Sequence, residues 1–192
     1  MLPIPPETEA LIFDCDGTLI DSMPIHIECW QAALLDRGVQ LPASYIDQRA
    51  GMPTDVIVRE MSVDFGVELD PAAVTDDKES RYLARLGEVQ PIHSVLATAQ
   101  HYQSKMPMAV ASGGERSIVV QSLAAVSALE LFGVMVTADD PVAAKPSPAI
   151  FLEAARQLKI DATRCHVFED ADHGITAARE AGMTWTDVRQ LS

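Results

Sequence analysis

Two aspartates stand one residue apart directly after an apolar run, in the stretch ALIFDCDGTLIDS that covers residues 10–22. On an extended strand, alternate side chains point to the same side about 6.5 Å apart, so Asp14 and Asp16 can share one site. Two such carboxylates repel each other unless a proton or a cation intervenes. The spacing therefore predicts a reactive or metal-binding pair at the end of a buried strand.

Two further carboxylates, Glu169 and Asp170, end the apolar stretch CHVFED. If both stretches are strands of one sheet, up to four carboxylates gather at neighbouring strand ends. Hard oxygen ligands without a paired His or Cys favour Mg²⁺, which usually also bridges to a substrate phosphate. These acidic residues predict a Mg²⁺ site.

The other polar groups fit phosphoryl transfer. An ionised Asp14 can attack phosphorus and form an aspartyl-phosphate. Asp16 can give a proton to the leaving oxygen and later take one from water. Ser112 and Gly113 in ASGG, and Lys145 in AKPSP, offer a hydroxyl, a backbone N–H and an ammonium to the phosphoryl oxygens.

Strand-like and helix-like apolar patterns alternate along the chain and would position these groups. The order predicts an α/β fold with a Rossmann-like, mostly parallel sheet that is covered by helices on both faces. Ligands of such sheets bind beyond the carboxyl ends of the strands. The expected strands are 10–15, 106–112, 133–138, 165–170 and 183–189, and the expected helices between them are 92–105, 115–128, 148–158 and 173–181.

One connection is far longer than a crossover needs. Roughly 90 residues separate the first two strands, whereas about a dozen suffice. Thr54 and Asp70 stand where helix N-caps belong, and the charge run TDDKESR (75–81) is typical of an exposed helix face. We expect a small helical cap, residues 22–90, inserted after the first strand of a core formed by 1–21 and 91–192. Its expected helices are 23–37, 43–49, 54–65 and 71–86.

Composition restricts the partners. The 192 residues carry a net charge of −14, which argues against nucleic acid or an anionic membrane as the main partner and favours a small molecule. The N-terminal stretch MLPIPPETEA lacks the basic flank and apolar block of a secretion signal. We expect a cytoplasmic protein; the sequence does not indicate its oligomeric state.

Four motifs, DCDGTLIDS, ASGG, KPSP and FEDADHGI, resemble in order and spacing those of the haloacid dehalogenase superfamily, over essentially the whole chain. The resemblance implies that Asp14 is the nucleophile and Asp16 the acid/base. It also implies that Mg²⁺ is bound by the Asp14 carboxylate, the Asp16 backbone carbonyl and Asp170, with Glu169 supporting these ligands. The dehalogenases themselves lack the second aspartate, so Asp16 favours phosphoryl transfer.

The inserted helices resemble the subclass that contains β-phosphoglucomutase and small sugar-phosphate phosphatases. The C-terminal motif region resembles phosphatases of fructose 1-phosphate and 6-phosphogluconate, which implies Mg²⁺-dependent hydrolysis of such a phosphate ester. The alternative is a β-phosphoglucomutase. Those mutases carry a lysine just before the cap-loop glycine and an arginine three residues after it, where this chain has Ala50 and Thr54, although Arg49 lies one residue away.

His26, Gly51 and Thr54 are the candidate substrate contacts of the cap. His26 resembles the mutase histidine near the acid/base, but its position equally fits the polar side of the first cap helix, and both interpretations stay open. A phospho-accepting signalling receiver is a third hypothesis, since receivers share the fold type, an aspartate, Mg²⁺ and a lysine. Receivers have adjacent acids after the first strand and no large cap, so the sequence favours an enzyme.

Overall fold

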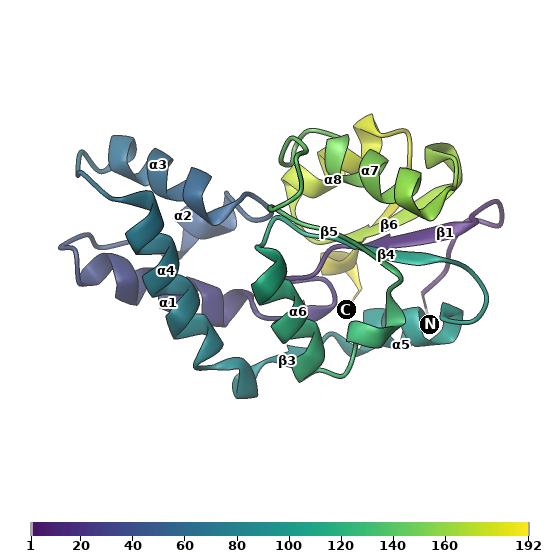
Figure 1. Ribbon diagram of the computed structural model, residues 1–192, viewed down its shortest axis with the longest axis horizontal. Coiled ribbons are helices and arrows are strands. Elements are labelled where there is room, and N and C mark those ends of the chain that lie inside the picture. Colours follow the sequence, from purple (N-terminus) through teal and green to yellow (C-terminus); the bar gives the residue numbers. More distant parts are fainter. Residues whose placement is uncertain (1, 192) are drawn as a thin grey trace.

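The computed structural model describes residues 2–191, and its centre is a five-stranded parallel sheet. The strand order is β5-β4-β1-β6-β7, with helices on both faces (Figure 1). This arrangement confirms the predicted α/β fold with a Rossmann-like core. The strands are β1 (Ala10–Phe13), β4 (Met108–Ala111), β5 (Val134–Val136), β6 (Cys165–Glu169) and β7 (Thr184–Asp187).

Strand β1 lies in the middle of the sheet and is fully buried. Its side chains alternate between the faces, because successive residues of a strand point to opposite sides. Leu11 and Phe13 pack in the cluster of α5 (His93–Tyr102) and α6 (Arg116–Ala125). Ala10 and Ile12 pack in that of α7 (Ala149–Leu158) and α8 (Asp172–Glu180). The packing on both faces therefore fixes the position of the carboxyl end of β1, which is followed by Asp14.

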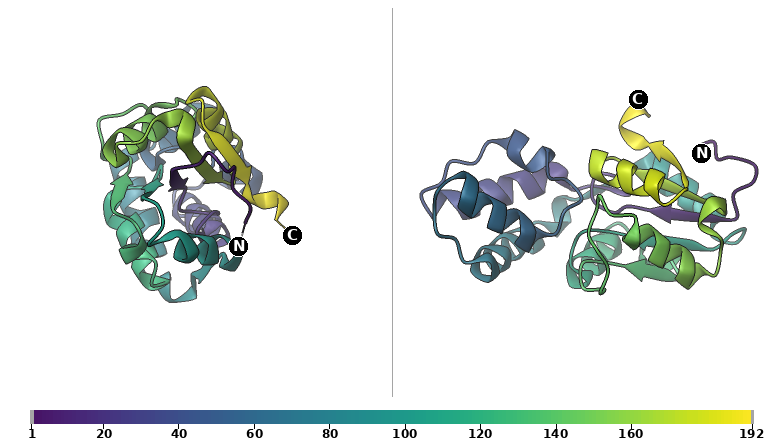
Figure 2. Two further views of the ribbon diagram at one scale, coloured as in Figure 1. Left: turned by 90° about the vertical axis from the view of Figure 1, so that its right-hand side faces the viewer. Right: turned by 90° about the horizontal axis from the view of Figure 1, so that it is seen from above.

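The long insertion forms four helices with a hydrophobic cluster of their own, built around side chains such as Trp30, Leu34 and Met61. The right view of Figure 2 shows these helices as a lobe beside the sheet. The bounds predicted for this cap, 22–90, stay a prediction. Its helices are α1 (Met23–Leu35), α2 (Ala43–Asp47), α3 (Thr54–Asp64) and α4 (Pro71–Leu83).

A two-stranded antiparallel sheet, which the sequence did not predict, lies where the chain enters and leaves the cap. It consists of β2 (Ile20–Asp21) and β3 (Gln90–Pro91). Ile20 pairs with Pro91 and Asp21 with Gln90. Runs of two residues carry no strand periodicity, so only the folded chain reveals this pairing.

The predicted N-cap at Thr54 is wrong, whereas the one at Asp70 is confirmed. Helix α3 is capped by Pro53, and Thr54 is its first helical residue. The Thr54 hydroxyl donates instead to Glu79 Oε1, at 3.1 Å. Asp70 accepts from the backbone N–H groups of the first turn of α4. Thr54 therefore joins α3 to α4 instead of ending a helix.

The prediction that residues 75–81 form an exposed helix face is confirmed for Asp76 and Ser80 and is wrong for the opposite side of the helix. Thr75, Lys78 and Glu79 are 4–7 % exposed. Helix α4 contacts α1 and α3 within the cap and α6 of the core, so it has neighbours on several sides. A run of charged residues predicts an exposed helix face only where one side of the helix has no neighbouring element. Among residues 2–191, no helix has both the length and the apolar character that crossing a membrane requires.

Candidate active site

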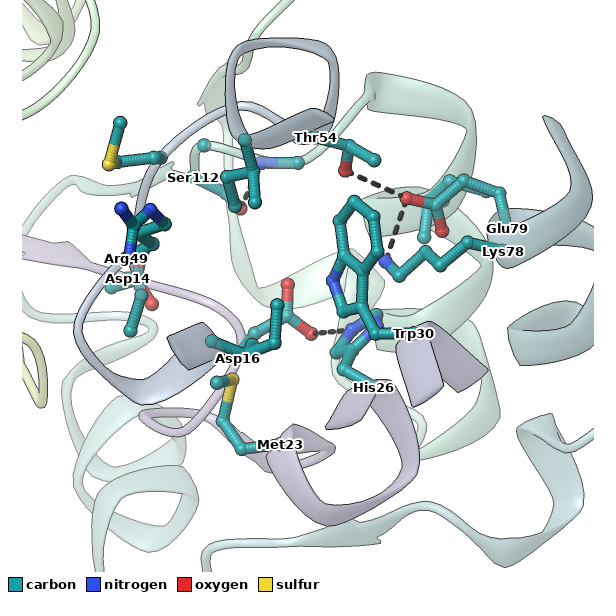
Figure 3. A pocket seen from close by; sticks show the side chains of 18 residues that line it. Asp14, Asp16, Met23, His26, Trp30, Arg49, Thr54, Lys78, Glu79 and Ser112 are labelled. Carbon is teal, nitrogen blue, oxygen red and sulfur yellow. Dashed lines mark hydrogen bonds and ion pairs between the residues drawn. The ribbon is translucent and has the colours of Figure 1, made fainter. Parts of the chain in front are cut away.

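A pocket opens where the carboxyl ends of β1 and β4 face the cap, and we call it the site pocket (Figure 3). Both parts of the molecule contribute to its lining, as expected for an α/β sheet whose ligands bind beyond the strand ends. The core supplies Asp14, Asp16, Ser112, Gly113, Gly114 and Ile118, and the inserted helices and loops supply Met23, His26, Trp30, Ile46, Arg49, Ala50, Gly51, Met52, Thr54, Ile57, Lys78 and Glu79.

Lys145 connects the acidic residues at the floor of the site. Its Nζ donates to Asp14 Oδ1 at 2.6 Å and to Glu169 Oε1 at 3.0 Å, and its side chain is fully buried. Burial lowers the pKa of Lys145, but the two carboxylates outweigh burial and hold it above its usual value. The two carboxylates therefore favour the charged form of Lys145, whose ammonium contacts the predicted nucleophile.

Carboxylates outnumber this ammonium. Oxygens of Asp14, Glu169 and Asp170 all lie within 4.8 Å of one another. Burial, and then the Glu169 charge, raise the pKa of Asp14 well above its usual value and that of Asp170 to about 7. A hard divalent cation would relieve this repulsion, and the all-oxygen donor set fits Mg²⁺.

The two oxygens of Glu169 are already engaged. Oε1 accepts from Lys145, and Oε2 accepts from the backbone N–H of Asp170 at 2.7 Å and of Ala171 at 3.4 Å. Asp14 and Asp170 are therefore the side chains best placed to bind the metal directly. This geometry supports the prediction that Glu169 holds the ligands in place and does not itself bind.

The Gly-Thr turn after the first motif packs directly on Asp170. Gly17 has a φ of +80°, and a Cβ at this residue would collide with the Asp170 carboxylate. Thr18 Oγ1 donates to Asp170 Oδ1 at 2.8 Å. Sequence reasoning missed Thr18, although its place two residues after Asp16 in the stretch DGT puts its hydroxyl near the strand end. The turn thus orients a candidate metal ligand from 152 residues away in sequence.

Asp16 lies in a different environment from Asp14. Its Oδ1 accepts from Ser22 Oγ at 2.6 Å and lies 3.1 Å from His26 Nε2 (Figure 3). Burial raises the pKa of Asp16, but His26 and Ser22 outweigh burial and lower it to about 2. Asp16 is thus ionised in the free protein, as a base must be. A phosphate dianion beside it would favour the protonated form that an acid requires.

His26 is part of this network and does not lie on a polar surface. It is 7 % exposed, and its ring stacks on Tyr82 with centroids 3.9 Å apart. Of the two interpretations of His26, the structure agrees with the one that places it beside the acid/base candidate, because its Nε2 contacts Asp16. Whether the histidine takes part in the chemistry stays a prediction.

The phosphate-binding candidates lie at the end of β4. The Ser112 hydroxyl is buried and accepts from the Gly114 N–H at 3.1 Å. A Cβ on Gly113 would collide with the backbone oxygen of Gly51, so the core loop and the cap loop touch at these two glycines. Gly51 is therefore part of the closure of the pocket, and only glycine fits at residue 113 in this arrangement.

A buried ion pair that sequence reasoning missed lies at the cap side of the pocket. Lys78 Nζ donates to Glu79 Oε1 at 2.8 Å, and Thr54 donates to the same oxygen. One signal existed in the sequence: Val74, Lys78 and Tyr82 are spaced by four residues and so share one helix face. The charged neighbours of Lys78 hid this pattern.

Arg49, the other cation of the cap lining, is also paired. Its Nε donates to Glu60 at 2.7 Å, and one terminal nitrogen donates to Asp64 at 3.0 Å. Its guanidinium also stacks over the Tyr45 ring, 3.6 Å from the centroid. The residue therefore does not supply the mutase clamp in this arrangement.

Comparison with known proteins agrees with this site. A family model described as haloacid dehalogenase-like hydrolase matches residues 11–188. Fructose-1-phosphate phosphatase YqaB of Escherichia coli (strain K12) is 36% identical over 182 residues, which cover 94% of this chain and 96% of that protein. The 6-phosphogluconate phosphatase of the same organism is 26% identical over 182 residues, covering 91% of this chain and 80% of that protein.

Solved structures agree on the fold. A crystal structure of β-phosphoglucomutase from Clostridium difficile superimposes with a TM-score of 0.81 at 22% identity, covering 96% of this chain and 87% of that one. The matches span both the sheet and the inserted helices. The chain is therefore an enzyme of the haloacid dehalogenase-like hydrolase family, whose curated relatives include named phosphatases.

Proposed function

We propose that the protein is a cytoplasmic, Mg²⁺-dependent phosphatase of small sugar phosphates that works through an aspartyl-phosphate on Asp14. The observation that carries this proposal is the buried group of Lys145 with the carboxylates of Asp14, Glu169 and Asp170 at the strand ends beside the site pocket. An excess of carboxylates beside a single ammonium suits a metal and a phosphate together.

The residues divide the reaction between them. Asp14 attacks phosphorus, and Asp16 protonates the departing sugar oxygen. Asp16, then ionised, takes a proton from the water that hydrolyses the aspartyl-phosphate. Lys145, the Ser112 hydroxyl and the Gly113 N–H stabilise the phosphoryl oxygens. Bound Mg²⁺ would be held by Asp14, Asp170 and the Asp16 carbonyl, and would neutralise negative charge between phosphate and enzyme.

The charges of the cap support hydrolysis over a mutase. A phosphoglucomutase must hold a sugar that carries phosphate at both ends during its cycle, which requires a second cationic site. Both cations of the cap lining are engaged, Arg49 by Glu60 and Asp64, and Lys78 by Glu79. The match to a hydrolase family likewise disfavours a signalling receiver.

The test is a panel of phosphates assayed with Mg²⁺ for two products, free phosphate and isomerised sugar. The panel includes fructose 1-phosphate, 6-phosphogluconate and β-glucose 1-phosphate. We expect release of phosphate with turnover. Conversion of β-glucose 1-phosphate to the 6-phosphate without free phosphate would identify a mutase, and a long-lived phosphoprotein without release would identify a receiver.

A further inference from the structure

The Lys78–Glu79 pair is a buried ion pair in the lining of the site pocket, and it has no role in the reaction proposed above. We propose that Glu79 is a specificity-determining residue that selects substrates whose end remote from the scissile phosphate is uncharged and hydroxylated. This inference rests on the proposed function and narrows it to phosphates of neutral polyols and sugars, as distinct from sugar-acid phosphates and bisphosphates.

The pair is built into the wall of the pocket. The side chains of Lys78 and Glu79 are 5% and 10% exposed. The ammonium also lies 5.6 Å from the Trp30 ring centre and 5.8 Å from that of Tyr82. In Figure 3, Glu79 lies across the pocket from Asp14, with Trp30 in view between them. The pair is therefore placed to meet the sugar, away from the reacting phosphorus.

The carboxylate of Glu79 has unused hydrogen-bonding capacity. Its Oε1 accepts from Lys78 and Thr54, whereas its Oε2 is buried and has no hydrogen-bond partner within residues 2–191. A buried acceptor without a partner is costly to keep. A sugar hydroxyl is a donor that a carboxylate accepts strongly, and a phosphate dianion or carboxylate offers no such proton.

The charge balance at this end points the same way. An unpaired lysine here would attract a second anionic group, but Glu79 cancels its charge at 2.8 Å. Arg49 cannot take over this role, because Glu60 and Asp64 hold its guanidinium. The Glu79 carboxylate would therefore repel an anionic group placed beside it. This repulsion is strong because little water screens it, so it would lower the affinity for a competing anionic substrate.

Two substrates that differ only at the remote end test this selection. Glucitol 6-phosphate and 6-phosphogluconate have the same carbon chain and the same phosphate, but one ends in an alcohol and the other in a carboxylate. We compare kcat/KM for both in the wild type, Glu79→Gln, Glu79→Asp and Glu68→Gln. Glu68 is an exposed residue of the same cap, outside the pocket lining, and serves as the matched control.

The wild type should prefer glucitol 6-phosphate. Glu79→Gln keeps an acceptor oxygen for Thr54 but frees the Lys78 charge, so the ratio of 6-phosphogluconate to glucitol 6-phosphate should rise about tenfold. Glu79→Asp keeps the charge and should keep the preference of the wild type, and Glu68→Gln should match the wild type. Because each ratio is taken within one protein preparation, a partly unfolded variant does not distort it.

Two outcomes would overturn the inference while leaving the proposed function intact. One is a wild type that prefers 6-phosphogluconate, and the other is a ratio that Glu79→Gln changes no more than Glu68→Gln does. If Glu79→Gln fails to fold, the same ratio is measured in Lys78→Met, which leaves the Glu79 charge without its cation and should lower the ratio of 6-phosphogluconate to glucitol 6-phosphate. An aryl phosphate tests the function separately: if the wild type hydrolyses no phosphate ester at all, the proposed function itself fails.

Discussion

Within residues 2–191 the protein contains two buried lysine–carboxylate groups, one at each end of its pocket, and they differ in charge balance. In the core, Lys145 meets Asp14 and Glu169, with Asp170 close by. In the cap, Lys78 meets Glu79 alone. The core group has an excess of negative charge and the cap group has none.

This difference separates two tasks. An excess of carboxylates favours the binding of a cation and, through it, of a phosphate. A balanced pair favours neutral ligands that donate hydrogen bonds. Under the two proposals above, the same residue types serve chemistry at one end and selection at the other, and the number of acids around each lysine distinguishes the two groups.

The largest expected effect is the loss of activity on substitution of Asp14, which belongs to the core group. Asp14→Asn removes the nucleophile, and we expect kcat/KM to fall by at least about four orders of magnitude for every phosphate ester. The fold should survive, because asparagine keeps an oxygen for Lys145 and removes a negative charge that is disfavoured by burial and by the neighbouring Glu169, the two causes that raise the pKa of Asp14. Activity assays and thermal melting measure both expectations.

Glu79→Gln is the matched change at the other end, an acid replaced by its amide. It should alter the choice between substrates and not abolish turnover of all of them. Appreciable activity of Asp14→Asn on any ester would break the comparison, because the excess negative charge would then have no catalytic use.

A second comparison measures stability. Lys145→Met leaves two buried carboxylates without their cation, and removal of one partner from such a group typically costs about 3–5 kcal/mol. Lys78→Met leaves only Glu79, which keeps the Thr54 hydroxyl, and should cost about 1–3 kcal/mol. Urea denaturation at pH 8 with a chelator measures the free energy of unfolding of both variants. Equal losses would mean that the two groups are not distinguished by charge balance.

The last expected effect is that of the metal on stability. Mg²⁺ that binds only the folded protein at a hundredfold excess over its Kd stabilises it by about 2.7 kcal/mol. For a chain of this size, we expect the Tm to rise by roughly 5–10 °C. Asp170→Asn should lose most of this rise, whereas Lys78→Met should keep it. Full retention of the rise in Asp170→Asn would exclude this carboxylate as a ligand.

The sequence predicted the core end of the pocket much better than the cap end. Asp14, Asp16, Ser112, Lys145 and Asp170 belong to short motifs at strand ends, where a parallel sheet brings distant residues together. The order of strands and helices was therefore enough to predict that they meet. The predicted strands and helices are all present, most of them shorter by a few residues at their ends.

The cap end depends on packing that no short motif records. Lys78 and Glu79 stand in a charged run that is typical of an exposed face, and they are buried only because α4 has neighbours on several sides. Thr54 was expected to cap a helix, but its hydroxyl donates to a side chain 25 residues further along. Such contacts follow from how helices cross, which depends on the whole set of their surfaces.

The paired residues of β2 and β3 also bear on how this molecule can change. The backbone passes from the sheet to the inserted helices and back at two neighbouring points, Ile20–Asp21 and Gln90–Pro91. An insertion or a new helix in between leaves the spacing of these two points unaltered, because their own hydrogen bonds fix it. The inserted helices can thus vary in length and sequence between these two points, provided that the residues which contact the core, such as His26 at Asp16 and Gly51 at Gly113, are kept.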